Sequence, residues 1–120
     1  MSILPHFELS SEQHDERTHV IHVKGEIHVS TAKDFAQRLD DAMSQDAGAI
    51  VLDLTEVEFI DSTGLTVLLN GQRNVTLRGG RLALAVSNPT VLRLFEITRL
   101  DSTLDIEPTL QDALKRVGAA

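Results

Sequence analysis

The sequence predicts an α/β domain: a mixed β-sheet of four to five strands, with about four α-helices packed mainly on one face. Two β-like stretches lead the chain, and helical and strand-like patterns alternate after them, as in a sheet covered by helices. With 120 residues, 42% hydrophobic and 24% charged, the chain has the length for one core and a globular composition. No linker-like stretch or internal repeat divides it, so a single domain over residues 1–120 is predicted.

The first two strands are expected within the N-terminal 25 residues. Phe7–Leu9 is a short β-like stretch, and Thr18–Lys24 (THVIHVK) is richer in β-branched residues, which favour strands. The polar segment SSEQHDER between them is predicted to be a turn. Gly25 is predicted to end the second strand.

The first helix is predicted from Ala32 to Met43. Apolar residues recur there at steps of three and four, and polar residues fill the other positions, which is typical of an amphipathic helix. Ser30 or Thr31 can cap its first turn. Gly48 lies just beyond its end.

A strand, a helix and another strand are predicted in the middle of the chain. AIVLDL at 49–54 is mostly apolar and bounded by polar residues, which suits a strand buried on both faces. The apolar positions within 65–77 suit a helix, which the two glycines at 79–80 would end. RLALAV at 81–86 is again strand-like.

The C-terminal quarter predicts two further helices around a short strand. Asn88 is expected to cap the first of these helices and Pro89 to open it. The segment 103–107 (TLDIE) is a candidate short edge strand. Pro108 or Thr109 starts a last helix, in which apolar residues recur at helical spacing. Thr109 and Asp112 have a spacing close to that of a capping box, with Asp in place of Glu.

The segment FIDSTGLTVLL, residues 59–69, holds four small polar residues between two apolar runs. If a helix begins near Ser62, then Asp61 or Ser62 lies at its N-cap and accepts hydrogen bonds from free backbone N–H groups. The same helix terminus can accommodate a phosphate on Ser62, because it presents N–H donors and a partial positive charge. That phosphate would add about −1.5 to −2 charge at neutral pH beside Asp61. The motif alone leaves a plain cap and a switch open, and caps are the commoner use.

The polar motifs do not match known catalytic ones. An aspartic-protease motif needs Asp-Thr/Ser-Gly, but Thr63 separates Ser62 from Gly64. A hydrolase nucleophile elbow needs glycine at position 60, where Ile60 stands. Since there is also no apparent nucleophile and base pair and no Walker-type loop, we predict that the chain is not an enzyme. No catalytic residue and no cofactor are predicted.

The five histidines do not predict a metal site. His19 and His22 are three residues apart in a probable strand, so their side chains point to opposite faces. His6, His14 and His28 have no recurring ligand spacing with them. We therefore expect surface histidines exposed to solvent.

The charge and the termini bear on partners and location. The chain carries 11 basic and 18 acidic residues, a net charge of −7, whereas nucleic acids and anionic membranes select clustered Lys and Arg. Neither partner is therefore expected. There is no cysteine, so disulfides are excluded. The start, MSILPHFEL, lacks a signal-peptide pattern and apolar runs are shorter than a membrane span, so a cytoplasmic location is expected.

Three separated segments resemble the STAS domain of bacterial anti-sigma factor antagonists. Strand-like VLDL, a short hydrophobic turn VEFI and then DSTGL, followed by an apolar helix ending in two glycines, are similar to the family's central segment. GEIHVSTA at 25–32 is similar to Gly-Glu-Leu-Asp-x-x-Thr-Ala. SNPTVLRLFEITRLD at 87–101 is similar to Pro-x-Val-x-x-x-Leu-x-x-(Thr/Ser)-Gly-Leu. The resemblance covers nearly the whole chain and implies a single STAS domain over 1–120.

The resemblance also implies a function. In the family, the serine directly after the aspartate, here Ser62, is phosphorylated by an anti-sigma factor with GHKL-type serine kinase activity. The unphosphorylated antagonist binds the anti-sigma factor and frees a sigma factor, and a metal-dependent serine phosphatase restores this form. Asp61 and Thr63 would shape the acceptor site, Gly64 would permit close approach, and the 25–32 segment would add contacts. The residues implied to contact the partner are Gly25, Glu26, His28, Thr31, Asp61, Ser62, Thr63, Gly64, Leu65 and Thr66.

The sequence departs from the family pattern at four positions. His28 stands where Asp is usual, Thr66 where Gly often occurs, Phe95 where Leu is usual and Arg99 where Gly is common. The Asp-Ser pair itself is unchanged. The alternative function is that of a non-switching STAS subunit, as in lipid-transport ATPase complexes or larger regulatory assemblies, in which Ser62 is only structural. A monomer or weak dimer is expected in either case.

Overall fold

The computed structural model describes residues 6–45 and 48–119, which form a mixed sheet of five strands, four α-helices and one 3-10 turn. The predicted fold class is confirmed. Residues 1–5, where the sequence shows no signal-peptide pattern, lie outside the described residues. The elements in chain order are β1 (Phe7–Gln13), β2 (Thr18–Ile27), α1 (Ala32–Ser44), β3 (Ala49–Ile60), α2 (Ser62–Leu77), β4 (Arg81–Ala85), α3 (Pro89–Ile97), η1 (Leu100–Ser102), β5 (Ile106–Glu107) and α4 (Leu110–Arg116).

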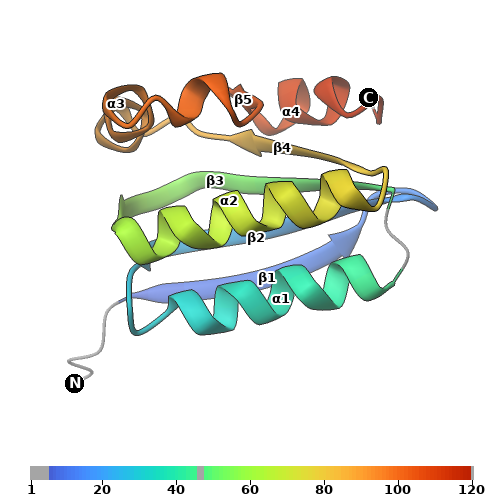
Figure 1. The fold of residues 1–120 in the computed structure, drawn as a ribbon, viewed down its shortest axis with the longest axis horizontal. Helices are drawn as coiled ribbons and strands as arrows, with labels where there is room; N and C mark the ends of the chain where they lie inside the picture. Colours follow the sequence, from blue (N-terminus) through green and yellow to red (C-terminus); the bar gives the residue numbers. More distant parts are fainter. Residues whose placement is uncertain (1–5, 46–47, 120) are drawn as a thin grey trace.

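The strands lie side by side in chain order, β1-β2-β3-β4-β5 (Figure 1). β1 runs antiparallel to β2, and all later neighbours are parallel. Each parallel pair is joined by a crossover helix, which is the usual connection between parallel strands. The carboxyl ends of β2 and β3 therefore meet at one edge of the sheet.

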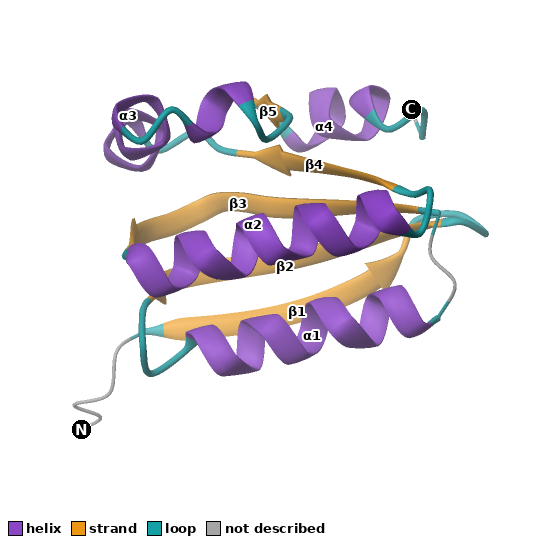
Figure 2. Cartoon of the chain, in the orientation of Figure 1, coloured by secondary structure: helices purple, strands orange, loops and turns teal. Residues whose placement is uncertain are grey.

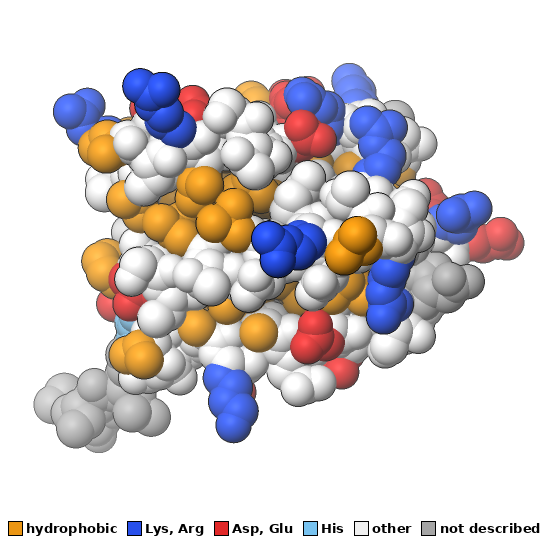
Figure 3. All heavy atoms as spheres, viewed as in Figure 1, with side chains coloured by type: hydrophobic (Ala, Val, Ile, Leu, Met, Phe, Trp, Pro, Cys, Tyr) orange, Lys and Arg blue, Asp and Glu red, His pale blue; other side chains and the backbone are white. Residues whose placement is uncertain are grey.

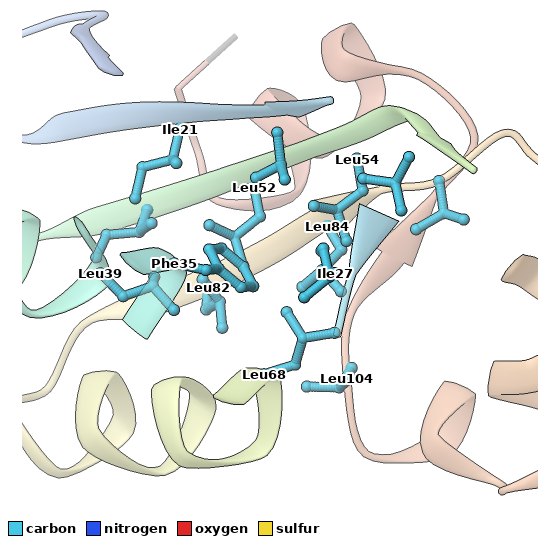
Figure 4. Packing of buried hydrophobic residues seen from close by; sticks show 14 of the residues in the cluster. Ile21, Ile27, Phe35, Leu39, Leu52, Leu54, Leu68, Leu82, Leu84 and Leu104 are labelled. Atoms are coloured by element: carbon cyan, nitrogen blue, oxygen red, sulfur yellow. The ribbon is translucent and has the colours of Figure 1, made fainter. Parts of the chain in front are cut away.

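The larger core lies between the sheet and the first three helices. Figure 2 shows α1 and α2 in front of the sheet, roughly along the direction of its strands, and Figure 4 shows Phe35 of α1 next to Leu52 and Leu82 of the strands. Phe35, Leu68 and Phe95, one from each of the three helices, are all fully buried in this core. The expected packing of helices mainly on one face is thus confirmed.

The helix α4 packs on the opposite face of the sheet. Its Ala113 and Leu114 join a second, smaller cluster with Val51 and Ala83 of the central strands. Because helices cover both faces, the strand β3 is apolar almost throughout its first half, as predicted for a strand buried on both sides.

Two strands are longer than the sequence predicts. The polar residues 10–13, predicted to be part of a turn, extend β1, which pairs with β2 through to Gln13. β1 is an edge strand, so exposed polar side chains can continue it. The segment VEFI, predicted to be a turn, continues β3, because its backbone stays paired with β2 up to Ile60. Both errors have one cause: pairing with the neighbouring strand of the sheet, and not the polarity of the segment itself, decides where a strand ends.

Gly25 lies inside β2 and does not end it, so that prediction is wrong. Its φ is +98°, a backbone conformation that favours glycine. The register of the β2–β3 pair shifts between Gly25 and Glu26, which marks a β-bulge. A Cβ at this position would lie 2.1 Å from the backbone oxygen of His6. The glycine thus allows the backbone at the start of β1 to lie close to the bulge.

The predicted caps of the last two helices are confirmed. Asn88 Oδ1 accepts hydrogen bonds from the Thr90 and Val91 N–H groups, at 2.8 and 3.3 Å. The Asp112 N–H donates to the Thr109 hydroxyl at 3.0 Å. These caps form from neighbours in the chain, which explains why the sequence alone reveals them.

Arg99 follows α3 with a φ of +62°. Non-glycine residues reach this left-handed region only at a cost of about 1–2 kcal/mol. Glycine is common at this position in the family that the sequence resembles. The left-handed backbone conformation of Arg99 explains that preference.

Candidate functional site

The two motifs that flank the serine meet at the carboxyl ends of β2 and β3. Ile27 and Ile60 are register partners at the ends of these strands. The backbone N–H of Asp61 donates to the Ile27 carbonyl at 3.1 Å. The 25–32 segment therefore lies beside the start of α2, as the resemblance implies, at the left edge of the sheet in Figure 1.

Asp61, and not Ser62, is the N-cap of α2. Its backbone is extended, and its Oδ1 accepts from the N–H groups of Thr63 at 2.9 Å and Gly64 at 3.1 Å. The Thr63 hydroxyl donates to the same oxygen. This hydroxyl, and then the two N–H groups, hold the pKa of Asp61 below its ordinary 3.8, against the opposing effect of burial. Asp61 is therefore a charged cap at neutral pH.

Ser62 is the first residue of α2 and is exposed. Its carbonyl accepts from the Thr66 hydroxyl at 2.9 Å. Among the described residues, 6–45 and 48–119, none forms a hydrogen bond with the Ser62 hydroxyl. Since Asp61 already supplies the cap, the Ser62 hydroxyl is left open to a partner or a transferase.

Gly64 and Leu65 lie underneath this surface. Both are buried, and a Cβ on Gly64 would come within 2.6 Å of Ile60 Cγ1 and 2.8 Å of Ile27 Cγ2. The close approach that Gly64 permits is thus that of the helix to the two strands. This packing fixes the distance between the first turn of α2, which carries Ser62, and the two strands.

The loop between β2 and α1 is held by Thr31. Its hydroxyl accepts from the His28 N–H at 3.0 Å and donates to the Glu26 carbonyl at 2.9 Å. Thr31 stands at the N-cap position of α1, but its side chain makes no cap hydrogen bond. The Ser30 N–H donates to His28 Nδ1 at 3.1 Å. An aspartate, which is usual at position 28 in the family, can accept a hydrogen bond from the N–H two residues ahead in the same way. His28 therefore makes the same kind of loop hydrogen bond.

The structure divides the ten predicted contact residues into surface and support. Ser62 and Thr66 are exposed, and Glu26, His28, Asp61 and Thr63 are partly exposed. Gly25, Thr31, Gly64 and Leu65 are buried. In the structure these last four residues lie beneath the exposed ones and support them, and their contact with a partner stays a prediction.

Exposed hydrophobic residues near the serine were missed in the sequence. Val29, in the β2–α1 loop, is 73% exposed, and Phe59, two residues before Asp61, is 47% exposed. Ile97 at the end of α3 is 67% exposed, and Figure 3 shows hydrophobic side chains gathered over α2 and α3. A hydrophobic residue in a predicted loop, such as Val29, is the signal that would have revealed them, because loops are otherwise polar.

The histidines differ from the predicted surface set. His19 is 7% exposed, because β2 is an internal strand of the sheet, so the prediction is wrong for this residue. His22 is partly buried between two carboxylates. Among the described residues, no group of three or more His, Cys, Asp or Glu is placed to bind a metal ion. Nor is any described helix long and apolar enough to cross a membrane.

Replacing Asp61 with alanine is expected to destabilise the fold by about 1 kcal/mol, the usual cost of losing an N-cap side chain. Asparagine keeps the acceptor oxygen, so Asp61→Asn should lower the stability by only a few tenths of a kcal/mol. Urea denaturation at neutral pH measures both variants. Because the folded pKa of Asp61 is lowered, its charge stabilises the fold above pH 3.8, and this contribution is lost as the pH falls through the lowered value. Equal losses in both variants would contradict the cap assignment.

The fold and this site define a small α/β binding domain that presents a serine at the start of a helix. Residues 10–113 match the STAS domain family. The chain therefore belongs to the STAS domain family. Its anti-sigma factor antagonists are regulatory binding proteins, in agreement with the prediction that the chain is not an enzyme.

Several relatives share both sequence and structure. The anti-sigma-B factor antagonist of Listeria monocytogenes is 34% identical over 87 residues, which cover 72% of this chain and 76% of the relative. The crystal structure of an anti-sigma factor antagonist from Mycobacterium paratuberculosis superposes with a TM-score of 0.85 and 30% identity, over 93% of this chain and 94% of that one. The Bacillus cell fate determinant SpoIIAA in its phosphorylated form gives a TM-score of 0.69 and 25% identity, over 93% and 99%.

Proposed function

We propose that this STAS domain is an anti-sigma factor antagonist switched by phosphorylation of Ser62. The unphosphorylated form binds an anti-sigma factor and thereby releases a sigma factor, and the phosphorylated form does not bind. The observation that carries this proposal is the exposed hydroxyl of Ser62 at the first position of α2, beside a cap that Asp61 supplies. The names of the relatives, and a solved relative in a phosphorylated form, support it.

The geometry explains how a phosphate can change binding without unfolding the domain. The start of a helix carries a partial positive charge, which favours an added anion. The phosphate needs no rearrangement of the cap, since the Thr63 and Gly64 N–H groups already bind Asp61. The added charge of about −1.5 to −2 therefore projects outward, next to the carboxylate of Asp61. A partner surface that fits the neutral serine would meet repulsion there.

The proposed partners follow from this switch. The anti-sigma factor supplies a GHKL-type serine kinase activity that transfers phosphate from ATP to Ser62, and a metal-dependent serine phosphatase removes it. Both act in the cytoplasm, where we place this protein as a single STAS domain in monomeric or weakly dimeric form. A non-switching subunit would need Ser62 only for structure, but the structural role at this helix start belongs to Asp61.

Incubation with a GHKL-type anti-sigma factor kinase from the same genome and Mg-ATP is expected to add one phosphate. Mass spectrometry of the intact protein and of its peptides would locate this phosphate on Ser62. Ser62→Ala should remove the labelling, whereas Thr66→Ala, which removes the hydroxyl one turn further along α2, should retain it. Unchanged labelling of Ser62→Ala would refute the assignment of the site.

A further inference from the structure

A three-residue cluster on the face of the sheet opposite α1 and α2 plays no part in the serine site. His22 of β2 lies between Glu12 of β1 and Asp53 of β3. Its Nε2 is 3.0 Å from Glu12 Oε1, and its Nδ1 is 2.7 Å from Asp53 Oδ2. The ring thus links the edge strand to the centre of the sheet.

Asp53 is held in place for this contact. Its Oδ1 accepts from the backbone N–H of Thr55 at 3.1 Å and from the Thr55 hydroxyl at 2.7 Å. Its other oxygen, Oδ2, faces His22. The side chain of Asp53 is only 15% exposed, whereas that of Glu12 is 59% exposed. The inner contact is therefore fixed, and the outer one lies at the surface.

The hydrogen-bonding capacity of the groups constrains the state of the ring. Ionised carboxylates only accept hydrogen bonds, and a neutral imidazole has one N–H donor. Both ring nitrogens of His22 face carboxylate oxygens at hydrogen-bond distance. A neutral ring would leave one nitrogen lone pair against a carboxylate, whereas an imidazolium donates to both.

We propose that His22 is a proton-dependent bridge: its imidazolium ties edge strand β1 to the sheet through Glu12 and Asp53, and the bridge is lost when the ring loses its proton. The backbone of β1 pairs with β2 alone, whereas the bridge also connects β1 to β3. It would make the stability of the domain depend on pH around neutrality, independently of the state of Ser62.

The charges around the cluster favour the protonated ring. Five carboxylates lie on the neighbouring strands β1 and β3 against one lysine of β2, whose Nζ lies 4.0 Å from Glu8 and 3.8 Å from Glu56. Helix α4 packs on the same face, and its Arg116 is paired with Asp105 and Glu107 at 2.8 Å. The charged and titratable groups on the elements around His22 are Glu8 and Glu12 of β1, His19, Lys24 and Glu26 of β2, Asp53, Glu56 and Glu58 of β3, and Asp112, Lys115 and Arg116 of α4.

The sign of the pH dependence follows. Partial burial opposes the charge on His22, but the hydrogen bonds to Glu12 and Asp53 and their negative charges outweigh it, so the pKa is raised above the ordinary 6.5. A group with a raised folded pKa stabilises the protein fully below its unfolded value. The contribution of the bridge is therefore complete below pH 6.5 and is lost as the pH rises through the raised pKa.

The direct test is an NMR titration of the His22 ring in the wild type and in Glu12→Gln. The wild-type midpoint should lie above 6.5, and Glu12→Gln should lower it by about half a pH unit or more, because a nearby opposite charge favours the protonated ring. Glu8→Gln is the matched control, since it removes a carboxylate from the same strand that contacts Lys24 and not His22, and it should shift the midpoint less. A wild-type midpoint at or below 6.5, or one unchanged in Glu12→Gln, would overturn the proposal.

Urea denaturation tests the consequence for stability. Between about pH 8.5 and about pH 6, the wild type should gain stability relative to His22→Gln. If both proteins have the same pH dependence, the bridge does not stabilise the fold. Should His22→Gln fail to fold, the exposed substitution Glu12→Gln serves in its place, and it should show a reduced gain.

Discussion

Ser62→Asp is expected to weaken binding to the anti-sigma factor at least tenfold while the domain stays folded. A carboxylate at the first position of α2 is favoured by the helix N-terminus, so the fold should tolerate it. It supplies about half the charge of a phosphoserine, and like charges brought together at an interface cost several kcal/mol. A tenfold loss corresponds to about 1.4 kcal/mol. Isothermal titration calorimetry measures the affinity, and circular dichroism monitors the fold.

Two substitutions separate charge from shape in this experiment. Ser62→Asn has nearly the shape of aspartate without its charge and should bind more tightly than Ser62→Asp. Thr66→Asp places the charge one turn further along α2 and tests how local the effect is. Wild-type affinity in Ser62→Asp would show that charge alone is not the switch. Loss of the folded spectrum would instead contradict the argument from the helix terminus.

Gly25→Ala is expected to destabilise the fold by more than about 2 kcal/mol, the largest loss of stability that we predict for one methyl group. The backbone conformation, with a φ of +98°, costs an L-residue about 1–2 kcal/mol. The new Cβ would also lie 2.1 Å from the backbone oxygen of His6, and overpacking of this kind costs about 1–3 kcal/mol. Because the clash is with backbone, β1 would have to move away from the bulge. Urea denaturation at neutral pH measures the loss.

Gly79→Ala is the matched control for Gly25→Ala. Gly79 also has a positive φ, +76°, but a Cβ there would meet no atom within 4 Å. Its cost should be limited to the backbone term of about 1–2 kcal/mol. Equal losses of stability in the two variants would show that β1 moves away from the new Cβ without cost, and that the contact with His6 does not constrain the bulge.

The roles of Asp61 and Ser62 are separable, and this is what makes a switch at this position possible. Asp61 binds the N–H groups of the first turn through a single oxygen, so modification of Ser62 does not compete with the cap. Asp61 substitutions should therefore change stability first, and Ser62 substitutions should change binding first. The sequence left the identity of the cap open between the two residues, since either type is a good cap.

Local signals in the sequence determined the helices and the caps of the last two. The spacing of apolar residues from Ala32 to Met43 predicts α1, and Asn88 and Thr109 cap α3 and α4 as expected. Helices depend on hydrogen bonds and contacts within a few residues, so a short window of sequence contains most of their information. The Asp-Ser pair that marks the candidate site is equally local.

Only the tertiary structure decided where the strands end, and which site residues reach the surface. β1 and β3 run past the predicted turns, because each stays paired with β2 beyond the point where its own sequence pattern ends, and the β3 partners are more than 30 residues away in the chain. Burial of Gly64 beneath Ser62 depends on Ile27 and Ile60 of two different strands, and His22 meets its carboxylates only across three strands. Long-range packing sets these environments, and no local pattern encodes them.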